Sequence, residues 1–499
     1  MKGFINKLHE LLDKAYVTNW LGVLLFCVLL LRIPSFFEPY YYGDEMIYMS
    51  LGQGMREGLT LYTDIYDNKP PLLYLTAMIA GNLFWFKAIL AFWNIATIVV
   101  FWNLARILFE KQEKLRKVAT IIFALLTTLP LLEGLTVNAE LFMIGLTLLA
   151  FFILLGKVVT PKKIFLAGTL FGIAALFKIP AAFDLPIIIF YWLVVEEVKE
   201  WKKIFINTVY LALGFITPIL LTFGWYFMSG AFSEYVKAAF LQNVGYVSSF
   251  RPDDVQKPFL VKNAPLLIRA LIVLLGTGLI YSLRKKLSNK FILFCLWTLF
   301  SLFAVTLSER PYPHYLIQSA APIAFLMAML IAENSLEQSL SVIPLLVTLL
   351  VPFHYKFYSY QTGTYYARFL NFATGRITKE AYLGGFSPNV KRNYEIADFL
   401  VKSTPPKEKV FMWDNDSPTV YALSRKLPPT KYVADYHVLD YSSKKDLAQE
   451  LTLNKPKFII LTSKHPFSEI NSLLSSDYLL IHHIENADIW SRLDLAPVK

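Results

Sequence analysis

The sequence predicts a mainly helical, polytopic membrane protein with a small α/β domain at its C-terminal end. Of its 499 residues, 56% are hydrophobic and 17% are charged, whereas about 25% of a typical soluble domain is charged. Apolar runs of span length recur up to residue 357, and shorter runs of strand length follow. We therefore expect a transmembrane module at 1–357, with a first external loop at 37–87, and an external α/β domain at 358–499.

Net charge and cysteine content argue against a nucleic-acid-binding protein and against a cysteine-based metal site. The net charge is +11, but the basic residues cluster in short loops between apolar runs, as the positive-inside rule expects. The charge therefore does not indicate nucleic-acid binding. Cys27 and Cys295 both lie inside apolar runs, so we interpret them as small core residues and expect neither a disulfide nor a cysteine metal site.

Eleven apolar segments have the composition of membrane spans. The lead at 1–18 is amphipathic and basic and is expected to be cytoplasmic, and the first span is expected to remain as an anchor because no small-residue cleavage site follows it. The expected spans are 19–36, 88–108, 118–132, 139–155, 164–177, 181–195, 204–228, 264–283, 291–307, 315–332 and 340–357.

Charge decides whether the additional apolar segment 71–86 crosses the membrane. It has only about 16 residues, fewer than the roughly 20 that a helical span needs. If it does not cross, four basic loops fall on the side of the N-terminus, and if it crosses, they all move outside. We therefore expect a juxtamembrane helix in the outer interface, with the N-terminus inside and the C-terminal domain outside. The basic external loop 229–262 and the loop at Glu333, which has no basic residue, fit this topology less well.

From about Tyr358, short apolar runs alternate with helix-like stretches. This alternation is typical of a small α/β domain. Strands are expected at 409–413, 457–462 and 478–484, and helices at 417–425, 443–453 and 466–474.

Charged side chains gather at four junctions that this topology places at the outer boundary of the membrane. Ionised groups are costly beside lipid and commonly functional there. A carboxylate can act as a general base toward a hydroxyl, and lysine or arginine can hold a phosphate. The candidates are Asp44 and Glu45, Asp67 and Lys69, Glu140, and Lys178 with Arg310 and His314.

A purely structural interpretation of each candidate stays open. Asp44 could cap a helix at 45–56, Glu140 could complement a helix dipole, and Lys178 could extend its ammonium group toward water. Arg310 and His314 could be solvated loop residues. The pair at 482–483 is not expected to bind a metal, because no third ligand stands at suitable spacing.

The order of the motifs resembles the GT-C glycosyltransferases. The nearest branch is the bacterial one related to protein O-mannosyltransferases and to the aminoarabinose transferase that acts on lipid A. The resemblance covers most of residues 15–360. Its motifs are G-D-E at 43–45, Y-T-D at 62–64, D-N-K-P-P-L at 67–72, N-A-E at 138–140, L-F-K-I-P at 176–180 and P-Y-P-H-Y at 311–315.

The resemblance implies a donor, a stereochemical course and several residue roles. In this family a sugar leaves a polyprenyl phosphate with inversion, outside the cytoplasm. Asp44 matches the base or acceptor-positioning aspartate, Glu140 matches a second acid in the same cavity, and Lys69 matches a lysine near the donor phosphate. The aminoarabinose transferase has a metal-associated glutamate just before that lysine. This chain has Asn68 there, so a divalent cation stays open, and no other cofactor is expected.

We therefore expect an inverting glycosyltransferase of the cell membrane whose acceptor is a lipid, a polysaccharide or a protein. The charged groups are expected to converge at one pocket opening. A transporter or flippase of a lipid-linked sugar is the alternative, although the sequence has no internal repeat. A non-catalytic scaffold is the third hypothesis. The expected roles are catalysis by Asp44, Glu140 and Glu45, donor-phosphate binding by Lys69, Arg310, Lys178 and His314, and substrate binding by Asp67 and Tyr315.

Overall fold

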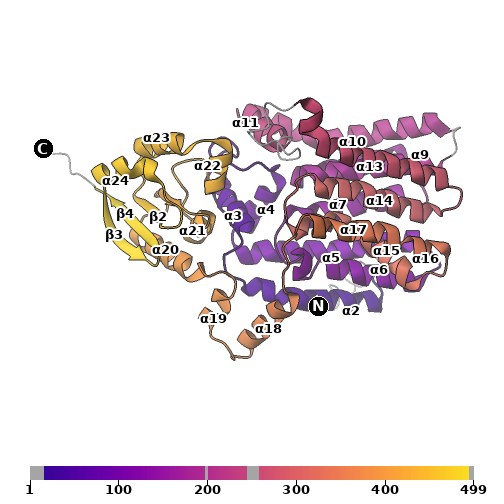
Figure 1. The fold of residues 1–499 in the computed structure, drawn as a ribbon, viewed down its shortest axis with the longest axis horizontal. Coiled ribbons are helices and arrows are strands. Elements are labelled where there is room, and N and C mark those ends of the chain that lie inside the picture. The colour runs from indigo at the N-terminus through magenta and orange to yellow at the C-terminus, as the bar shows by residue number, and fades with distance from the viewer. Residues whose placement is uncertain (1–15, 197–199, 244–257, 494–499) are drawn as a thin grey trace, which may run out of the picture. The chain divides into compact units, whose positions relative to one another are not determined.

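The computed structural model describes residues 16–196, 200–243 and 258–493, and these residues form two compact units. Of these residues, the helical unit comprises 16–35, 87–196, 200–227, 240–243 and 258–362, and the mixed unit comprises 36–86, 228–239 and 363–493 (Figure 1). Most of the predicted basic lead, including Lys2, Lys7 and Lys14, lies outside the described residues, as does the part of the loop 229–262 that falls on 244–257.

The helical unit contains most of the apolar segments. Within the described residues, seven helices are long enough and apolar enough to cross a bilayer, which indicates a multi-pass membrane protein. The predicted segments 139–155 and 181–195 correspond to shorter apolar helices, so the total of eleven spans stays a prediction. The elements are α2 (Asn19–Arg32), η1 (Ile33–Phe37), α5 (Leu83–Leu108), α6 (Glu113–Leu126), η2 (Pro130–Leu132), α7 (Ala139–Leu154), α8 (Pro161–Phe177), η3 (Ile179–Asp184), α9 (Leu185–Val195), α10 (Trp201–Met228), η5 (Lys237–Leu241), α13 (Phe259–Leu283), α14 (Asn289–Thr306), η7 (Pro313–Ser319), α15 (Ala320–Ala332), α16 (Leu336–Leu340) and α17 (Val342–His354).

Burial separates central helices from peripheral ones. The span that ends with α15 is 78% buried, whereas the most apolar part of α13 is only 6% buried. Stacked rings fill the centre: the ring centroid of Phe101 lies 4.2 Å from that of Phe123 and 4.6 Å from that of Phe325. Apolar faces as exposed as that of α13 would promote aggregation in water, so they are suited to contact with lipid.

Three glycines bring α8 and α10 into close contact. Gly168 and Gly172 stand four residues apart on α8, and Gly214 lies on α10. A Cβ added at Gly168 would collide with the carbonyl of Leu211, and one at Gly214 would collide with the carbonyl of Phe165. Small residues at this spacing let the backbones of membrane helices approach closely.

The mixed unit combines helices with a four-stranded sheet of order β1-β2-β4-β3. Strands β1 and β2 pair in parallel, and β4 pairs antiparallel with both β2 and β3. The predicted C-terminal α/β region is therefore confirmed. The elements are α3 (Gly43–Arg56), α4 (Leu72–Ala80), α11 (Phe232–Val236), α18 (Thr362–Ala373), α19 (Lys379–Gly384), α20 (Val390–Ser403), β1 (Val410–Trp413), α21 (Ser417–Ser424), α22 (Asp435–Tyr441), α23 (Lys444–Asn454), β2 (Phe458–Thr462), η8 (Ser468–Ile470), α24 (Asn471–Asp477), β3 (Tyr478–Ile484) and β4 (Ala487–Arg492).

The first loop packs with the C-terminal region inside the mixed unit. Helix α3 contacts α21, and the hydroxyl of Ser50 donates to the carbonyl of Pro418 at 3.2 Å. This compact unit contains both 36–86 and residues beyond 362. The predicted domain boundary near residue 358 stays a prediction.

Helix α4 occupies the apolar segment for which we predicted no crossing. Its nine residues span about 14 Å, roughly half the hydrocarbon thickness of a bilayer. It ends at Gly81, whose φ of 74° suits a residue without a Cβ. Helix α5 starts at Leu83, earlier than the predicted 88, because the apolar pattern continues through Phe84 and Trp85. The position of α4 in the outer interface stays a prediction.

Candidate active site

A buried ion pair forms the centre of a polar cluster in the helical unit. Glu140 lies in the first turn of α7, and Lys178 directly follows α8. The start of α7 and the end of α8 meet because the two helices pack against each other as neighbours in the chain. The Nζ of Lys178 donates to Oε1 of Glu140, and the two side chains are 14% and 3% exposed.

His314 connects this pair to a second carboxylate. Its Nδ1 pairs with Oε2 of Glu133, and its Nε2 lies 3.8 Å from Oε1 of Glu140. All three side chains are buried. One imidazole thus lies between two carboxylates, an arrangement that can hold or transfer a proton.

Two buried cations fix the loop that carries Glu133. Nη2 of Arg32 donates to the carbonyls of Thr127 and Gly134, each at 2.9 Å. The Nζ of Lys87 donates to the carbonyl of Leu135 at 3.1 Å. Glu133 itself has a φ of 56°, a conformation that costs energy for a non-glycine residue and persists only where surrounding contacts hold it.

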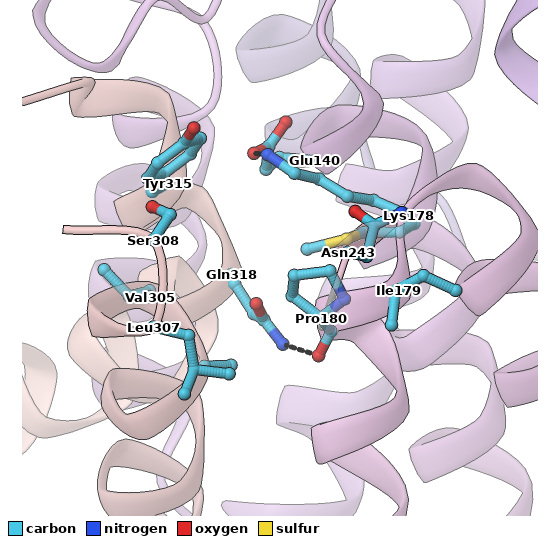
Figure 2. Close-up of a pocket in the computed structure, with 12 residues that line it drawn as sticks. Glu140, Lys178, Ile179, Pro180, Asn243, Val305, Leu307, Ser308, Tyr315 and Gln318 are labelled. Carbon is cyan, nitrogen blue, oxygen red and sulfur yellow. Dashed lines mark hydrogen bonds and ion pairs between the residues drawn. The ribbon is translucent and has the colours of Figure 1, made fainter. Parts of the chain in front are cut away.

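A small cavity of about 30 Å³ adjoins the Glu140–Lys178 pair (Figure 2). The ammonium of Lys178 lies 4.0 Å from the ring centroid of Tyr315, which also lines the cavity. Figure 2 shows the Nε2 of Gln318 donating to the carbonyl of Pro180, at 2.9 Å. This volume has room for one or two water molecules, so a sugar or a lipid phosphate would require the surrounding helices to separate.

A second charged cluster lies in the mixed unit. The Nζ of Lys69 is 3.9 Å from Oδ2 of Asp44 and 3.5 Å from Oδ2 of Asp67. Asp44 lies in the first turn of α3, its side chain is 32% exposed, and its Oδ2 accepts from the hydroxyl of Tyr48 at 2.9 Å. The helix cap is Tyr42, so the interpretation of Asp44 as an N-cap is wrong. The carboxylate of Asp44 is thus only partly buried.

Asp67 is fully buried and is held by a residue from the C-terminal region. Its Oδ1 lies 3.3 Å from Nε2 of His437 on α22 and accepts from the backbone N–H of Asn68 at 2.6 Å. Burial alone raises the pKa of Asp67, but Lys69 and His437 outweigh it and hold the pKa below its usual range. Burial and the charge of Asp67 also raise the pKa of Tyr74. Asp67 therefore stays ionised and anchors Lys69.

Further contacts attach the same loop to α22 and the segment before it. The Nδ2 of Asn68 donates to the hydroxyl of Tyr441 at 2.7 Å, and the backbone N–H of Tyr66 donates to the carbonyl of Lys431 at 2.9 Å. The ring of Tyr66 packs against that of Tyr432, with centroids 5.2 Å apart. The D-N-K-P-P motif is thus positioned largely by residues more than 360 positions away in the chain.

The structure brings the predicted residues together in two groups. Lys69 gathers Asp44 and Asp67 in the mixed unit, and Glu140 gathers Lys178, His314 and Tyr315 in the helical unit. Glu45 is fully buried next to Asp44, and Arg310 is exposed. That all of these side chains share one pocket stays a prediction.

Sequence reasoning missed Glu133 and His437. Glu133 could have been noticed as an acid inside the apolar stretch 130–137, whereas no local signal marks His437. Among the residues described here, no group of three or more histidine, cysteine or acidic side chains is arranged to hold a metal ion.

Solved structures show which fold the chain adopts. It is similar to ArnT from Cupriavidus metallidurans bound to undecaprenyl phosphate, with a TM-score of 0.60 and 12% identity over 96% of this chain and 99% of that one. The apo state of the same protein has a TM-score of 0.56 and 13% identity over 96% of this chain and 98% of that one. An Archaeoglobus fulgidus oligosaccharyltransferase tethered to an acceptor peptide has a TM-score of 0.45 and 12% identity over 90% of this chain and 70% of that one. The predicted GT-C fold is confirmed.

Sequence comparison adds one local similarity. A family model described as "competence-induced protein Ccs4 C-terminal domain" matches residues 390–488, which include β1, β2, β3 and the first two residues of β4. No curated protein matches the chain.

Proposed function

We propose that this chain is an inverting membrane glycosyltransferase that takes a sugar from a polyprenyl phosphate and transfers it to an acceptor hydroxyl at the outer face of the membrane. The observation that carries the proposal is the buried cluster of Glu140, Lys178 and His314 within a GT-C fold. Buried charges in a membrane helix bundle are costly and mark substrate sites. A similar fold has been solved with undecaprenyl phosphate bound, which supports a lipid-linked donor.

Asp44 is the proposed base. It combines partial exposure with two neighbours that orient it, the hydroxyl of Tyr48 and the ammonium of Lys69. In the reaction, Asp44 accepts the proton of the acceptor hydroxyl while the acceptor oxygen bonds to the anomeric carbon. The bond from that carbon to the phosphate oxygen breaks, and its electron pair leaves with the polyprenyl phosphate. A positioned general base accelerates such a step by about 10²–10⁴-fold.

Basic side chains are proposed to stabilise the departing phosphate. Lys178 is the strongest candidate, since its ammonium borders the cavity and is paired with Glu140. When the donor binds, its phosphate competes with Glu140 for this lysine, and the Nε2 of His314, 3.8 Å from Oε1 of Glu140, offers that carboxylate another polar partner. Lys69 and Arg310 are proposed to contribute further positive charge. In this proposal Glu140 positions the sugar or the acceptor.

The remaining candidates are proposed to hold other side chains or the sugar in place. Asp67 holds Lys69 from a fully buried site, so its contribution to substrate binding is indirect. Glu45 is buried beside Asp44, and Tyr315 supplies an aromatic face on which a sugar ring can stack.

The test is a transfer assay with the purified full chain and a panel of polyprenyl-phosphate sugars, each followed by donor consumption. Asp44→Asn keeps the size of the side chain and should lower turnover at least about 10²-fold. The matched control is Asp64→Asn, an exposed aspartate of the same loop, which should retain turnover within about twofold. Near-normal turnover of Asp44→Asn would refute the assigned role. Movement of donors across a vesicle membrane without consumption would instead favour a transporter.

A further inference from the structure

A second cavity lies at the opposite end of the helical unit's helix α6 from Glu133. It has a volume of about 620 Å³ and opens where α2 and α6 begin and α5 ends. Glu133 follows the C-terminal end of α6, so this cavity is separate from the candidate active site. Its distinctive lining is three aromatic residues, Tyr16, Trp20 and Trp102, and three basic residues, Arg106, Arg116 and Lys117.

Each of the three cations lies over an aromatic ring. The guanidinium of Arg106 is 3.6 Å from the ring centroid of Tyr16, and that of Arg116 is 5.8 Å from the ring centroid of Trp102. The ammonium of Lys117 is 5.7 Å from the ring centroid of Trp20. A guanidinium that stacks by its face keeps its in-plane N–H donors directed sideways, where they match the oxygens of a phosphate.

The positive charge in the cavity is only partly balanced. Glu113, the acidic residue in the lining, pairs with Lys117 at 2.7 Å. Arg106 donates from Nη1 to the neutral amide oxygen of Asn103 at 3.1 Å. The Nε of Arg116 is buried without an acceptor among the described residues, and a buried donor without a partner costs free energy. An anion in the cavity would balance the remaining positive charge of Arg106 and Arg116.

The surroundings of the cavity favour a lipid as the source of that anion. Helix α2, which begins at its edge, exposes Val23 by 64% and Phe26 by 60%, and this helix is one of the seven of span length. Tryptophan and tyrosine are typical of the membrane–water boundary. Basic pockets between membrane helices at that boundary bind anionic headgroups.

We propose that this cavity binds an anionic phospholipid, with its phosphate held by Arg106 and Arg116 and its acyl chains along the exposed face of α2. The positive-inside rule places this end of the helical unit on the cytoplasmic side. The inference does not depend on the proposed glycosyl transfer, because none of its residues belongs to the candidate active site.

The experiment is native mass spectrometry of the detergent-purified full chain with phosphatidylglycerol and phosphatidylcholine of identical acyl chains. Phosphatidylglycerol should bind at least about tenfold more tightly. The double variant Arg106→Gln/Arg116→Gln should weaken its binding roughly thirtyfold and leave phosphatidylcholine binding unchanged. The matched control, Lys285→Gln/Lys286→Gln, removes two exposed basic residues that do not line the cavity and should bind like the unmodified chain.

Two further measurements keep the proposal falsifiable. Arg106→Lys/Arg116→Lys, which retains the charge but not the planar donors, should bind phosphatidylglycerol more tightly than the glutamine variant and less tightly than the unmodified chain, and the unmodified chain should lose its preference at high salt. Equal binding of the two lipids by the unmodified chain would overturn the proposal even if the glutamine variant does not fold. Full competition by glycerol phosphate at the concentration of the lipid would also overturn it, because the cavity would then recognise a free phosphate.

Discussion

Replacing His437 by leucine tests whether the C-terminal region holds the first-loop motif in place. The Nε2 of His437 lies 3.3 Å from a carboxylate oxygen of Asp67, and the two side chains are 3% and 0% exposed. Leucine has a similar volume but no polar atom. The variant therefore removes this contact and leaves Lys69, at 3.5 Å, as the charged neighbour of the buried carboxylate of Asp67.

The expected cost follows from the burial of the pair. Removing a buried hydrogen-bond partner of a charged group costs about 1.5–3 kcal/mol, and the complete burial of Asp67 favours the upper value. For a unit of this size, about 3 kcal/mol lowers the unfolding temperature by roughly 6–12 °C. Because the two side chains interact directly, the double variant Asp67→Asn/His437→Leu should be about 1–3 kcal/mol more stable than the sum of the single variants predicts.

The assay is thermal unfolding of the purified full chain in detergent for the unmodified protein, both single variants and the double variant. His483→Leu is the control. His483 lies in the same region and pairs with Asp488 at 2.7 Å, but its side chain is 65% exposed, so its loss should not shift the transition measurably. A shift of less than about 2 °C for His437→Leu, or strictly additive effects, would refute the reasoning.

Two other predictions concern the mixed unit. Buried Arg392 bonds to Asp414 and Asp416 at 3.1 and 3.0 Å, so Arg392→Met should cost about 3–5 kcal/mol. Limited proteolysis should then cut the sheet region quickly, whereas equal resistance of Arg392→Met and the exposed control Lys391→Met would contradict this. Second, the pKa of Asp67 in the folded chain lies below its ordinary value of 3.8. Its contribution to stability should therefore be complete above about pH 5 and fall as pH drops below about 4. Asp67→Asn should flatten this acid-side loss in pH-dependent unfolding, and an unchanged slope would contradict the assignment.

Residues close in the chain, or at the ends of adjacent helices, were within reach of sequence reasoning. Asp44, Asp67 and Lys69 belong to one short loop, and their charges meet in the structure. Glu140 and Lys178 could be paired because two consecutive antiparallel spans bring the start of the first to the end of the second. The candidates His314 and Tyr315 join Glu140 and Lys178 from a distant part of the chain, and no local pattern predicts those contacts.

The contacts that sequence reasoning missed join distant parts of the chain. Glu133 meets His314 across 181 positions, and the packing of η2 against η7 that brings them together leaves no periodic trace in the sequence. Strand β4 was missed for another reason. Half of its sequence, A-D-I-W-S-R, is polar, and it becomes a strand through pairing with both β2 and β3.

The glycine contacts between α8 and α10 restrict how the membrane part can rearrange to admit a lipid. Backbones that touch without intervening side chains cannot slide past or tilt away from each other without losing close packing along the whole seam. Lys178 directly follows α8, so the contact between α8 and α10 restricts the position of the Lys178 backbone. Entry of a bulky substrate therefore has to displace helices other than α8 and α10. A larger side chain at Gly168 would push α8 away from α10 and move Lys178 with it.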